Sequence, residues 1–330
     1  MSALLEVENL GVSFGAFRAV DGVSLSVGPG EVVGIVGESG SGKSVTALAL
    51  MGLVDEPGVV AATRLDFDGR DLLTMREHDR RQMLGRDIAM IFQDPMTSLN
   101  PVLTIGRQIR EAIETHFDMS KADANRRVAD LLEQVGIPSP DIRLKDYPHQ
   151  FSGGMRQRAM IAMALACEPK VLIADEPTTA LDVTIQAQIL TLLRELVAEE
   201  DTALILITHD LGVVAGMCER VNVMYAGMFM ETGSAERLFA TPRHPYTLGL
   251  LQSVPRLDAP RRAKLQPIEG APRDMLSPPH ACPFQPRCRF EVELSRNEVP
   301  TLEETEPGHF VACFNPVPAD EWARELAVGG

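Results

Sequence analysis

A glycine-rich octapeptide near the N-terminus carries the clearest chemical signature in the sequence. Gly37-Glu38-Ser39-Gly40-Ser41-Gly42-Lys43-Ser44 fits the pattern G-x-x-x-x-G-K-[ST]. An apolar run, Val32–Val36, precedes it and a helix-like run, Ser44–Leu50, follows it, so the required order of strand, loop and helix is present. Glycines let successive backbone N–H groups turn toward phosphates, and the positive end of the helix favours the same anion. The pattern therefore predicts a nucleotide-binding loop whose ligands are Gly37, Ser39, Gly40, Ser41, Gly42, Lys43 and Ser44.

Within this loop two residues have more specific predicted roles. Lys43 is expected to reach the β- and γ-phosphates, and Ser44 is expected to ligate Mg²⁺. Both roles follow from the pattern rather than from composition.

Two adjacent carboxylates follow a second apolar run. Residues 170–174 read as a buried strand, and Asp175 and Glu176 come directly after it. In enzymes that transfer phosphoryl groups, an Asp at a strand end holds the metal, and a neighbouring residue orients or deprotonates the attacking water. We therefore predict Asp175 as a partner of Mg²⁺ and Glu176 as the catalytic base.

Polar side chains also end two other predicted strands. Gln93 closes the short apolar strand 87–92, where it could reach the nucleotide and its metal, and His209 follows the buried strand 203–208. A Gln at a strand end is usually solvated, and a lone His there is more often structural than catalytic. In this context both side chains would end beside the same ligand.

The whole chain limits the class of protein. It has 330 residues, which is enough for a substantial core, and a formal net charge of −15, which gives no support to nucleic-acid binding. The start of the chain is not of signal-peptide type, and no apolar stretch approaches the ~20 residues that span a bilayer. We therefore expect a cytoplasmic protein with at most a peripheral membrane role. Five cysteines in such a chain argue against a disulfide framework.

Periodicity places the remaining elements. Alternating apolar residues from Leu4 to Val27 predict antiparallel strands. Helical spacing from Thr104 to Gly136 predicts two helices, and Ser152-Gly153-Gly154 opens another helix with donors for an anion. The proline-rich stretch 255–279 reads as a linker.

These motifs together resemble the nucleotide-binding subunits of ABC transporters. The set comprises the phosphate loop, Gln93, Ser152-Gly153-Gly154-Met155-Arg156-Gln157, Asp175-Glu176, Ala180-Leu181-Asp182 and His209, in the family's order and spacing. The resemblance covers about residues 4 to 250. It implies an α/β P-loop NTPase core in residues 1–255, with an N-terminal antiparallel β subdomain and a helical subdomain at about 100–165.

The resemblance also implies roles for single residues. The family closes two ATP molecules at a dimer interface, and Ser152 and Gly154 would contact the ATP of the partner, with Gly153 and Gln157 in the same signature. Asp182 would link the two sites, Gln93 would couple the nucleotide to membrane subunits, and His209 would hold the γ-phosphate. Phe14 matches the position that stacks on adenine, although a core aromatic is nearly as good an interpretation of it.

A second resemblance concerns the C-terminal region. Pro242–Thr247, Pro267–Gly270 and Cys282–Cys288 look like the corresponding region of the dipeptide, oligopeptide and nickel transporter ATPases. This implies a C-terminal extension over 256–330, and an ATPase that energises import of di- or oligopeptides at the cytoplasmic face of the membrane. The implied partners are a second ATPase subunit, two permeases and an extracytoplasmic binding protein. Nickel or another small solute stays open as the cargo.

Three cysteines of this region are candidate metal ligands. Cys282, Cys288 and Cys313 resemble the family's four-cysteine pattern for a 4Fe-4S cluster, but Ser295 stands where the remaining cysteine is expected. Thiolates are the usual ligands of such clusters. A zinc site with His280 or His309 and an unligated remnant are the alternatives.

Other classes of ABC protein fit less well. A DNA-repair or chromosome ATPase would insert long heptad repeats between the phosphate loop and the signature, and the segment 93–152 is too short for them. Ribosome-associated members generally carry two cassettes, and exporters are usually fused to membrane helices. This chain has one phosphate loop and no such helices.

Overall fold

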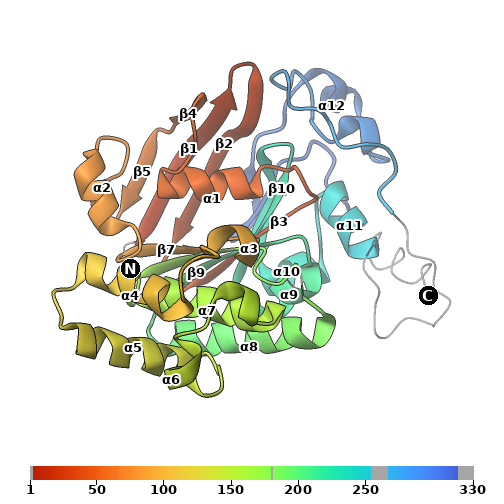
Figure 1. The fold of residues 1–330 in the computed structure, drawn as a ribbon. Coiled ribbons are helices and arrows are strands. Elements are labelled where there is room, and N and C mark those ends of the chain that lie inside the picture. Colours follow the sequence, from red (N-terminus) through yellow and green to blue (C-terminus); the bar gives the residue numbers. More distant parts are fainter. Residues whose placement is uncertain (1–2, 180, 254–266, 319–330) are drawn as a thin grey trace. The chain divides into compact units, whose positions relative to one another are not determined.

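The computed structural model describes residues 3–179, 181–253 and 267–318 (Figure 1). The chain divides into two compact units. The first unit combines Val27–Glu31 with Asp68–Leu206, and the second combines Leu5–Ser26, Val32–Phe67 and the chain from Ile207 onward. Ala180 and the domain boundary predicted at 255/256 lie outside the described residues.

The first unit contains a buried parallel sheet. Its strand β7 (Ile88–Ile91) pairs in parallel with β8 (Val171–Asp175), and β9 (Ala203–Thr208) lies on the other side of β8. Every residue of β8 and β9 is buried, as the continuous apolar runs predict for strands covered on both faces. The ends of β7 and β8 come to one edge, because Ile91 pairs with Ala174. The short strand β6 (Arg70–Asp71) completes the strands of this unit.

Helices account for most of the remaining first unit. The two helices predicted from the apolar spacing are α4 (Ile105–His116) and α5 (Lys121–Gln134). Thr104 and Ser120 cap their first turns by accepting hydrogen bonds from backbone N–H groups. Figure 1 shows both beside α6 (Pro140–Arg143) and α7 (Gly153–Leu165). The others are α2 (Glu77–Met83), α3 (Pro95–Ser98), the 3₁₀ turn Pro148–Gln150 and α8 (Val183–Glu199).

The second unit begins with an antiparallel sheet, as the alternating pattern predicts. Its strand β1 (Leu5–Phe14) lies between β2 (Phe17–Val27) and β5 (Arg64–Phe67), and also pairs antiparallel with β4 (Gly58–Ala61). Leu5, Val7, Leu10 and Val12 of β1 are buried. Alternation with more exposed neighbours is typical of a sheet with one face on the core.

Another group of strands in this unit positions the glycine-rich loop. Strand β3 (Val32–Val36) runs parallel to β10 (Arg220–Tyr225), and β10 is antiparallel to β11 (Met228–Ser234). Beyond β11 the sheet continues into β13 (His309–Val311) and β12 (Glu303–Glu306). Both strands belong to residues 267–318, which we call the C-terminal segment. The helices of this unit are α1 (Lys43–Met51), α9 (Leu211–Met217), α10 (Ala235–Ala240), α11 (Pro245–Gln252), α12 (Glu293–Asn297) and the 3₁₀ turn Gln285–Arg287.

A buried carboxylate joins the C-terminal hairpin to this sheet. Glu231 of β11 is fully buried; its Oε1 lies 2.7 Å from Nε2 of His309 and accepts the backbone N–H of Arg243 at 2.7 Å. Its Oε2 accepts the N–H of His244 at 3.0 Å. These partners satisfy a group that would otherwise be costly to bury.

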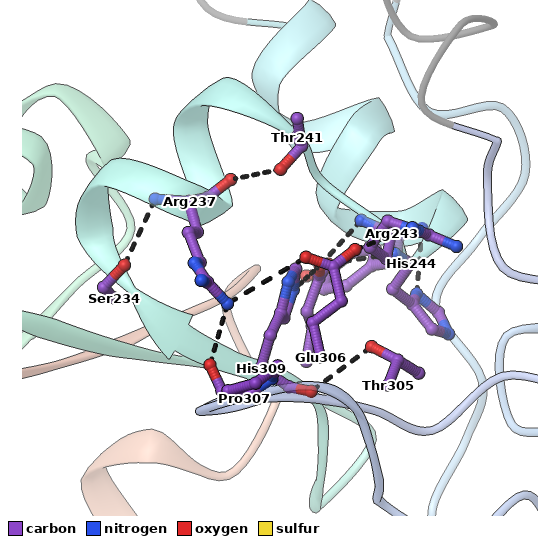
Figure 2. Close-up of polar contacts among 11 residues, drawn as sticks. Ser234, Arg237, Thr241, Arg243, His244, Thr305, Glu306, Pro307 and His309 are labelled. Carbon is purple, nitrogen blue, oxygen red and sulfur yellow. Dashed lines mark hydrogen bonds and ion pairs between the residues drawn. The ribbon is translucent and has the colours of Figure 1, made fainter.

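Exposed ion pairs surround this buried contact. Figure 2 shows Glu306 of β12 between Arg237 and Arg243, with His309 next to it. The Nη1 atom of Arg237 also donates to the carbonyl oxygen of Pro307 at 2.7 Å. The hairpin is therefore attached by both strand pairing and side chains.

Cys167 and Cys218 are buried, as predicted for core packing, and Cys282 is buried as well. Burial raises the pKa of Cys218 to about 12. Among the described residues no helix combines the length and apolar character needed to cross a bilayer.

We predict that Glu231→Gln destabilises the folded protein by about 2 kcal/mol. Both carboxylate oxygens of Glu231 accept hydrogen bonds from backbone N–H groups. The glutamine would place its own NH₂ group opposite one of these donors, and that hydrogen bond would be lost. Thermal unfolding followed by circular dichroism measures this. The matched control is Glu298→Gln, at an exposed position of the C-terminal segment. Equal unfolding temperatures for the two variants would contradict the prediction.

Candidate functional site

The glycine-rich loop lies between β3 and α1, where its backbone comes close to neighbouring chain. A Cβ atom added to Gly37 would lie 2.1 Å from the carbonyl oxygen of Met224, and one added to Gly42 would lie 2.5 Å from that of Ala19. Gly42 also has φ of 108°, a conformation that side chains disfavour. Glycine is therefore required at both ends of the loop.

The groups of this loop suit a phosphate chain. Lys43 is buried, and its Nζ donates to the carbonyl oxygens of Gly37 at 2.8 Å and Glu38 at 2.9 Å, so the ammonium lies over the loop. The hydroxyl of Ser41 is buried and has no hydrogen-bond partner within the described part of the chain. No side chain caps the first turn of α1. These donors fit the nucleotide phosphates that the sequence predicts here. Ser39 and Gly40 are exposed, and Ser44 is half-buried in α1.

The first unit brings Gln93 and Glu176 together. Gln93 follows β7 and Glu176 follows β8, and Nε2 of Gln93 donates to Oε2 of Glu176 at 2.9 Å. The hydroxyl of Thr179 donates to the same oxygen at 2.8 Å. Asp175 is buried at the end of β8. The ends of β7 and β8 thus bring Gln93 and Glu176 into contact, and two donors fix the carboxylate of Glu176.

The backbone of Glu176 is strained. Its φ is 45°, which is uncommon for a residue with a long side chain. Such strain is concentrated at functional sites, because surrounding structure must enforce it. This observation supports the functional role that the sequence predicts for Glu176.

The signature segment forms the start of α7. Ser152 is exposed, and its hydroxyl accepts the backbone N–H of Met155 at 3.3 Å. A Cβ atom at Gly154 would lie 3.0 Å from Cγ2 of Ile185, so the beginnings of α7 and α8 are closely packed. Asp182 caps α8 by accepting the N–H of Ile185 at 3.0 Å. The predicted roles of Ser152, Gly153, Gly154 and Asp182 toward a second nucleotide remain predictions. Gln157 is buried within α7, and its role stays a prediction too.

His209 and Phe14 belong to the second unit. His209 is exposed directly after β9. Phe14 ends β1 opposite Gly58, and a Cβ atom at Gly58 would lie 2.7 Å from its ring. The ring is half-buried, which suits either interpretation of Phe14. The γ-phosphate role of His209 and the adenine role of Phe14 stay predictions.

Sequence reasoning missed two residues that touch the phosphate loop. The hydroxyl of Tyr246 accepts the backbone N–H of Glu38 at 2.8 Å, and Arg287 forms an ion pair with the carboxylate of Glu38. Both belong to C-terminal motifs whose resemblance was noted but whose contacts were not predicted. One sequence feature could have pointed to the contact of Arg287 with the loop: it is a charged residue inside the Cys-Pro-Phe-Gln-Pro-Arg-Cys motif.

Burial raises the pKa of all three cysteine thiols of this segment. Burial raises the pKa of Cys288 to about 11 and that of Cys313 to about 12. The hydroxyl of Ser295 donates to the carbonyl oxygen of Val292 at 2.6 Å and so is engaged within α12. In the described ranges no three His, Cys, Asp or Glu residues are arranged to hold a metal ion.

The histidines considered for a zinc site do not change this result. His309 directs Nε2 to Glu231, and His280 is exposed. The iron–sulfur and zinc ligand sets therefore stay predictions.

Two family models match the sequence. One, described as ABC transporter, matches residues 20–179. The other, described as the C-terminal region of oligopeptide/dipeptide transporters, matches residues 230–294. The two matched ranges correspond to the two resemblances in the sequence.

Similar proteins extend over nearly the whole chain. The dipeptide transport ATP-binding protein DppD of Escherichia coli K12 is 54% identical over 319 residues, which cover 96% of this chain and 97% of that protein. The oligopeptide transport ATP-binding protein OppD of the same strain is 53% identical, covering 96% and 94%. DppD of Bacillus subtilis 168 is 52% identical, covering 95% of each.

Solved structures share the fold. A dimeric ATP-binding cassette in a post-hydrolysis state, bound to ADP and Pi, superimposes with a TM-score of 0.62 at 26% identity, covering 70% of this chain and 98% of its own. The cbiO1 protein of Clostridium perfringens, part of the ABC transporter complex cbiONQ, has a TM-score of 0.62 at 28% identity, covering 73% and 92%.

We predict that Lys43→Ala lowers the affinity for MgATP by roughly 10- to 100-fold, because charge-assisted hydrogen bonds to the phosphates are lost. Titration with a fluorescent ATP analogue measures the change. Lys145→Ala, at an exposed position of the first unit, is the control. Unchanged affinity of the Lys43 variant would remove Lys43 from the site.

Proposed function

We propose that this chain, which belongs to the ABC transporter family of ATP-binding proteins, energises an importer of di- or oligopeptides. The observation that carries the proposal is the extended similarity to dipeptide and oligopeptide transport ATP-binding proteins, which includes the C-terminal region. The chain binds ATP with Mg²⁺ and hydrolyses it, as members of this family do. The peptide cargo comes from the relatives and is the proposed part.

We propose a separate role for each group of residues at the ATP site. The phosphate loop and Lys43 hold the β- and γ-phosphates, and Ser44 with Asp175 would hold Mg²⁺, which neutralises charge that develops on the transferred phosphoryl group. Glu176 accepts a proton from the attacking water as general base. Gln93 and Thr179 orient Glu176 by donating hydrogen bonds to one of its carboxylate oxygens. His209 is proposed to contact the γ-phosphate, and Phe14 to stack on adenine.

A second ATPase subunit is proposed to complete each site. Ser152 and Asp182 are exposed at the beginnings of α7 and α8, so they are accessible to a partner. Ser152, Gly153 and Gly154 would bind the γ-phosphate of the partner's ATP. Closure of the dimer would then depend on ATP, and hydrolysis would remove the bridge between subunits. In a transporter, the dimer would alternate between an open and a closed state and so drive two permeases. An extracytoplasmic binding protein would deliver the solute to these permeases. A heterodimer is the proposed form.

Nickel or another small solute is the second candidate cargo. The C-terminal motifs also resemble those of nickel transporter ATPases, and cargo specificity resides in permeases and binding proteins rather than in this chain. The ATPase role is the same in both cases. A membrane-associated location at the cytoplasmic face follows from either proposal.

We predict that Glu176→Gln lowers the ATPase rate by at least about 100-fold, because the amide cannot accept the proton of the attacking water. ATP binding is expected to persist, since the phosphate loop is unchanged. Phosphate release and nucleotide binding are measured on the same preparation. A variant that hydrolyses ATP at a near-normal rate would overturn the assignment of the base.

The cargo is tested with the transporter assembled in lipid. The chain is co-expressed with the permease and ATPase subunits encoded beside it, and ATPase activity is measured with binding protein loaded with peptides or with nickel. Stimulation by peptides supports the proposal. Stimulation by nickel alone moves the assignment to metal uptake.

For the three cysteines we propose the unligated interpretation over the iron–sulfur and zinc alternatives, because the hydroxyl of Ser295 is engaged elsewhere and no three ligand residues are arranged for a metal ion in the described ranges. Iron, sulfide and zinc are measured on anaerobically purified protein. Four irons and four sulfides per chain would establish a cluster and contradict the proposal; one zinc per chain would contradict it equally.

A further inference from the structure

The C-terminal segment contacts the phosphate loop through one arginine. Arg287 lies 249 positions from Glu38, and its Nη1 and Nη2 atoms donate to the two carboxylate oxygens of Glu38 at 2.6 and 3.0 Å. Only 3% of the Arg287 side chain is exposed. Bidentate pairing of this kind fixes orientation as well as distance. The second residue of the phosphate loop is therefore held from outside the loop.

Other contacts hold Arg287 in this orientation. Its Nε donates to the carbonyl oxygen of Glu269 at 3.0 Å, and Nη2 donates to that of Ile268 at 3.3 Å. The pairing with Glu38 raises the pKa of Arg287 further above its ordinary value, so the guanidinium is charged at any physiological pH. Since Ile268 and Glu269 belong to the Pro267–Gly270 motif, two C-terminal motifs converge on one contact.

A second connection reaches the backbone of the same residue. The hydroxyl of Tyr246 accepts the N–H of Glu38 at 2.8 Å, and the N–H of Tyr246 donates to Nδ1 of His244 at 3.0 Å. Burial lowers the pKa of His244 to about 3, so its ring is neutral, and the ring also bonds to the backbone of Ala312. Through His244, Tyr246 is thus linked to Ala312, which follows β13. Through its hydroxyl, Tyr246 is linked to the phosphate loop.

Aromatic packing makes this contact rigid. The rings of Tyr225 and Tyr246 lie 4.7 Å apart, and the ring of Phe284 lies 5.3 Å from each. The guanidinium of Arg287 lies 5.8 Å from the centre of the Tyr225 ring, within the range of cation–π attraction. All three rings are buried. Because Phe284 packs against Tyr225 and Tyr246, a movement of the C-terminal segment would also move Arg287 and Tyr246.

The contacts of Glu38 continue into the ligand-binding groups. Its carbonyl oxygen accepts from Nζ of Lys43 at 2.9 Å and from the N–H of Ser41 at 3.2 Å. A change in the position of Glu38 therefore changes the positions of Lys43 and Ser41. Arg287 does not contact the phosphates itself, and it acts through Glu38.

On the premise that the loop binds ATP as described above, we propose that Arg287 is a positioning residue for ATP binding. Together with Tyr246, Arg287 makes the conformation of the phosphate loop depend on the folded C-terminal segment. The segment thereby sets the affinity of the site for ATP. The catalytic step depends on Glu176 of the first unit, which this contact does not include. The expected signature is a change in ATP affinity with little change in the maximal rate.

We predict that Arg287→Ala raises the KM for ATP in the assembled transporter, and the Kd of the full chain for a fluorescent ATP analogue, about tenfold, as loss of a charge-assisted hydrogen bond implies. The maximal rate is expected to stay within about twofold. Arg287→Lys should recover part of the affinity, because lysine keeps the charge but not the bidentate geometry. Arg296→Ala is the matched control, since its guanidinium pairs with Glu291 within the same segment.

A double-mutant cycle separates positioning from general loss of structure. If Arg287 acts through Glu38, then Arg287→Ala weakens ATP binding much less in a Glu38→Ala background than alone. Additive effects, or unchanged affinity in Arg287→Ala, would overturn the inference. An equal loss in Arg296→Ala would also overturn it, because the effect would then belong to the fold of the segment. Wild-type protein that fails to bind the analogue would overturn the ATP-binding assignment as well.

Discussion

The close approach of backbone to backbone around the glycine-rich loop is the constraint on which the site depends. Carbonyl oxygens from β2 and β10 occupy the space where side chains of Gly42 and Gly37 would lie. The backbone of the loop can therefore pack this closely against the neighbouring strands only because glycine stands at both positions. Lys43 and the Glu38 contacts then complete the arrangement. In physical terms, phosphate binding here is a property of packed strands as much as of the loop sequence.

Much of this could be predicted from the sequence, because the relevant signals are local. The phosphate loop needs glycines at fixed spacing, and buried strands that end in polar residues predict where Gln93, Asp175 and Glu176 stand in the chain, although not the hydrogen bond between Gln93 and Glu176. The P-loop ABC ATPase fold and the ATPase activity are confirmed by the family. The ion pair between Glu38 and Arg287 could not be predicted, since it joins positions far apart in the chain and depends on how the C-terminal segment folds back. The strained φ of Glu176 was equally inaccessible, because backbone conformation at one residue has no single-residue signature.

The C-terminal segment illustrates how one substitution changes the interpretation of a motif. Ser295 stands where a fourth cysteine is expected, and its hydroxyl closes a hydrogen bond within α12 while its backbone carbonyl accepts the N–H of Cys282 at 3.0 Å. The serine thus takes a local structural role. The same segment supplies Arg287 and Phe284, so its contribution to the molecule does not require a metal.

The hairpin formed by β12 and β13 has a further consequence for the protein's behaviour in solution. Among the described strands, β12 lies at one edge of its sheet, and its sequence, Glu303-Glu304-Thr305-Glu306, is fully exposed. An outer strand offers unpaired backbone groups to other chains, and charge on that strand discourages such pairing. Three carboxylates therefore repel a like strand at this edge. Removal of the hairpin would leave the apolar strand β11, with Phe229 and Met230, as a template for aggregation.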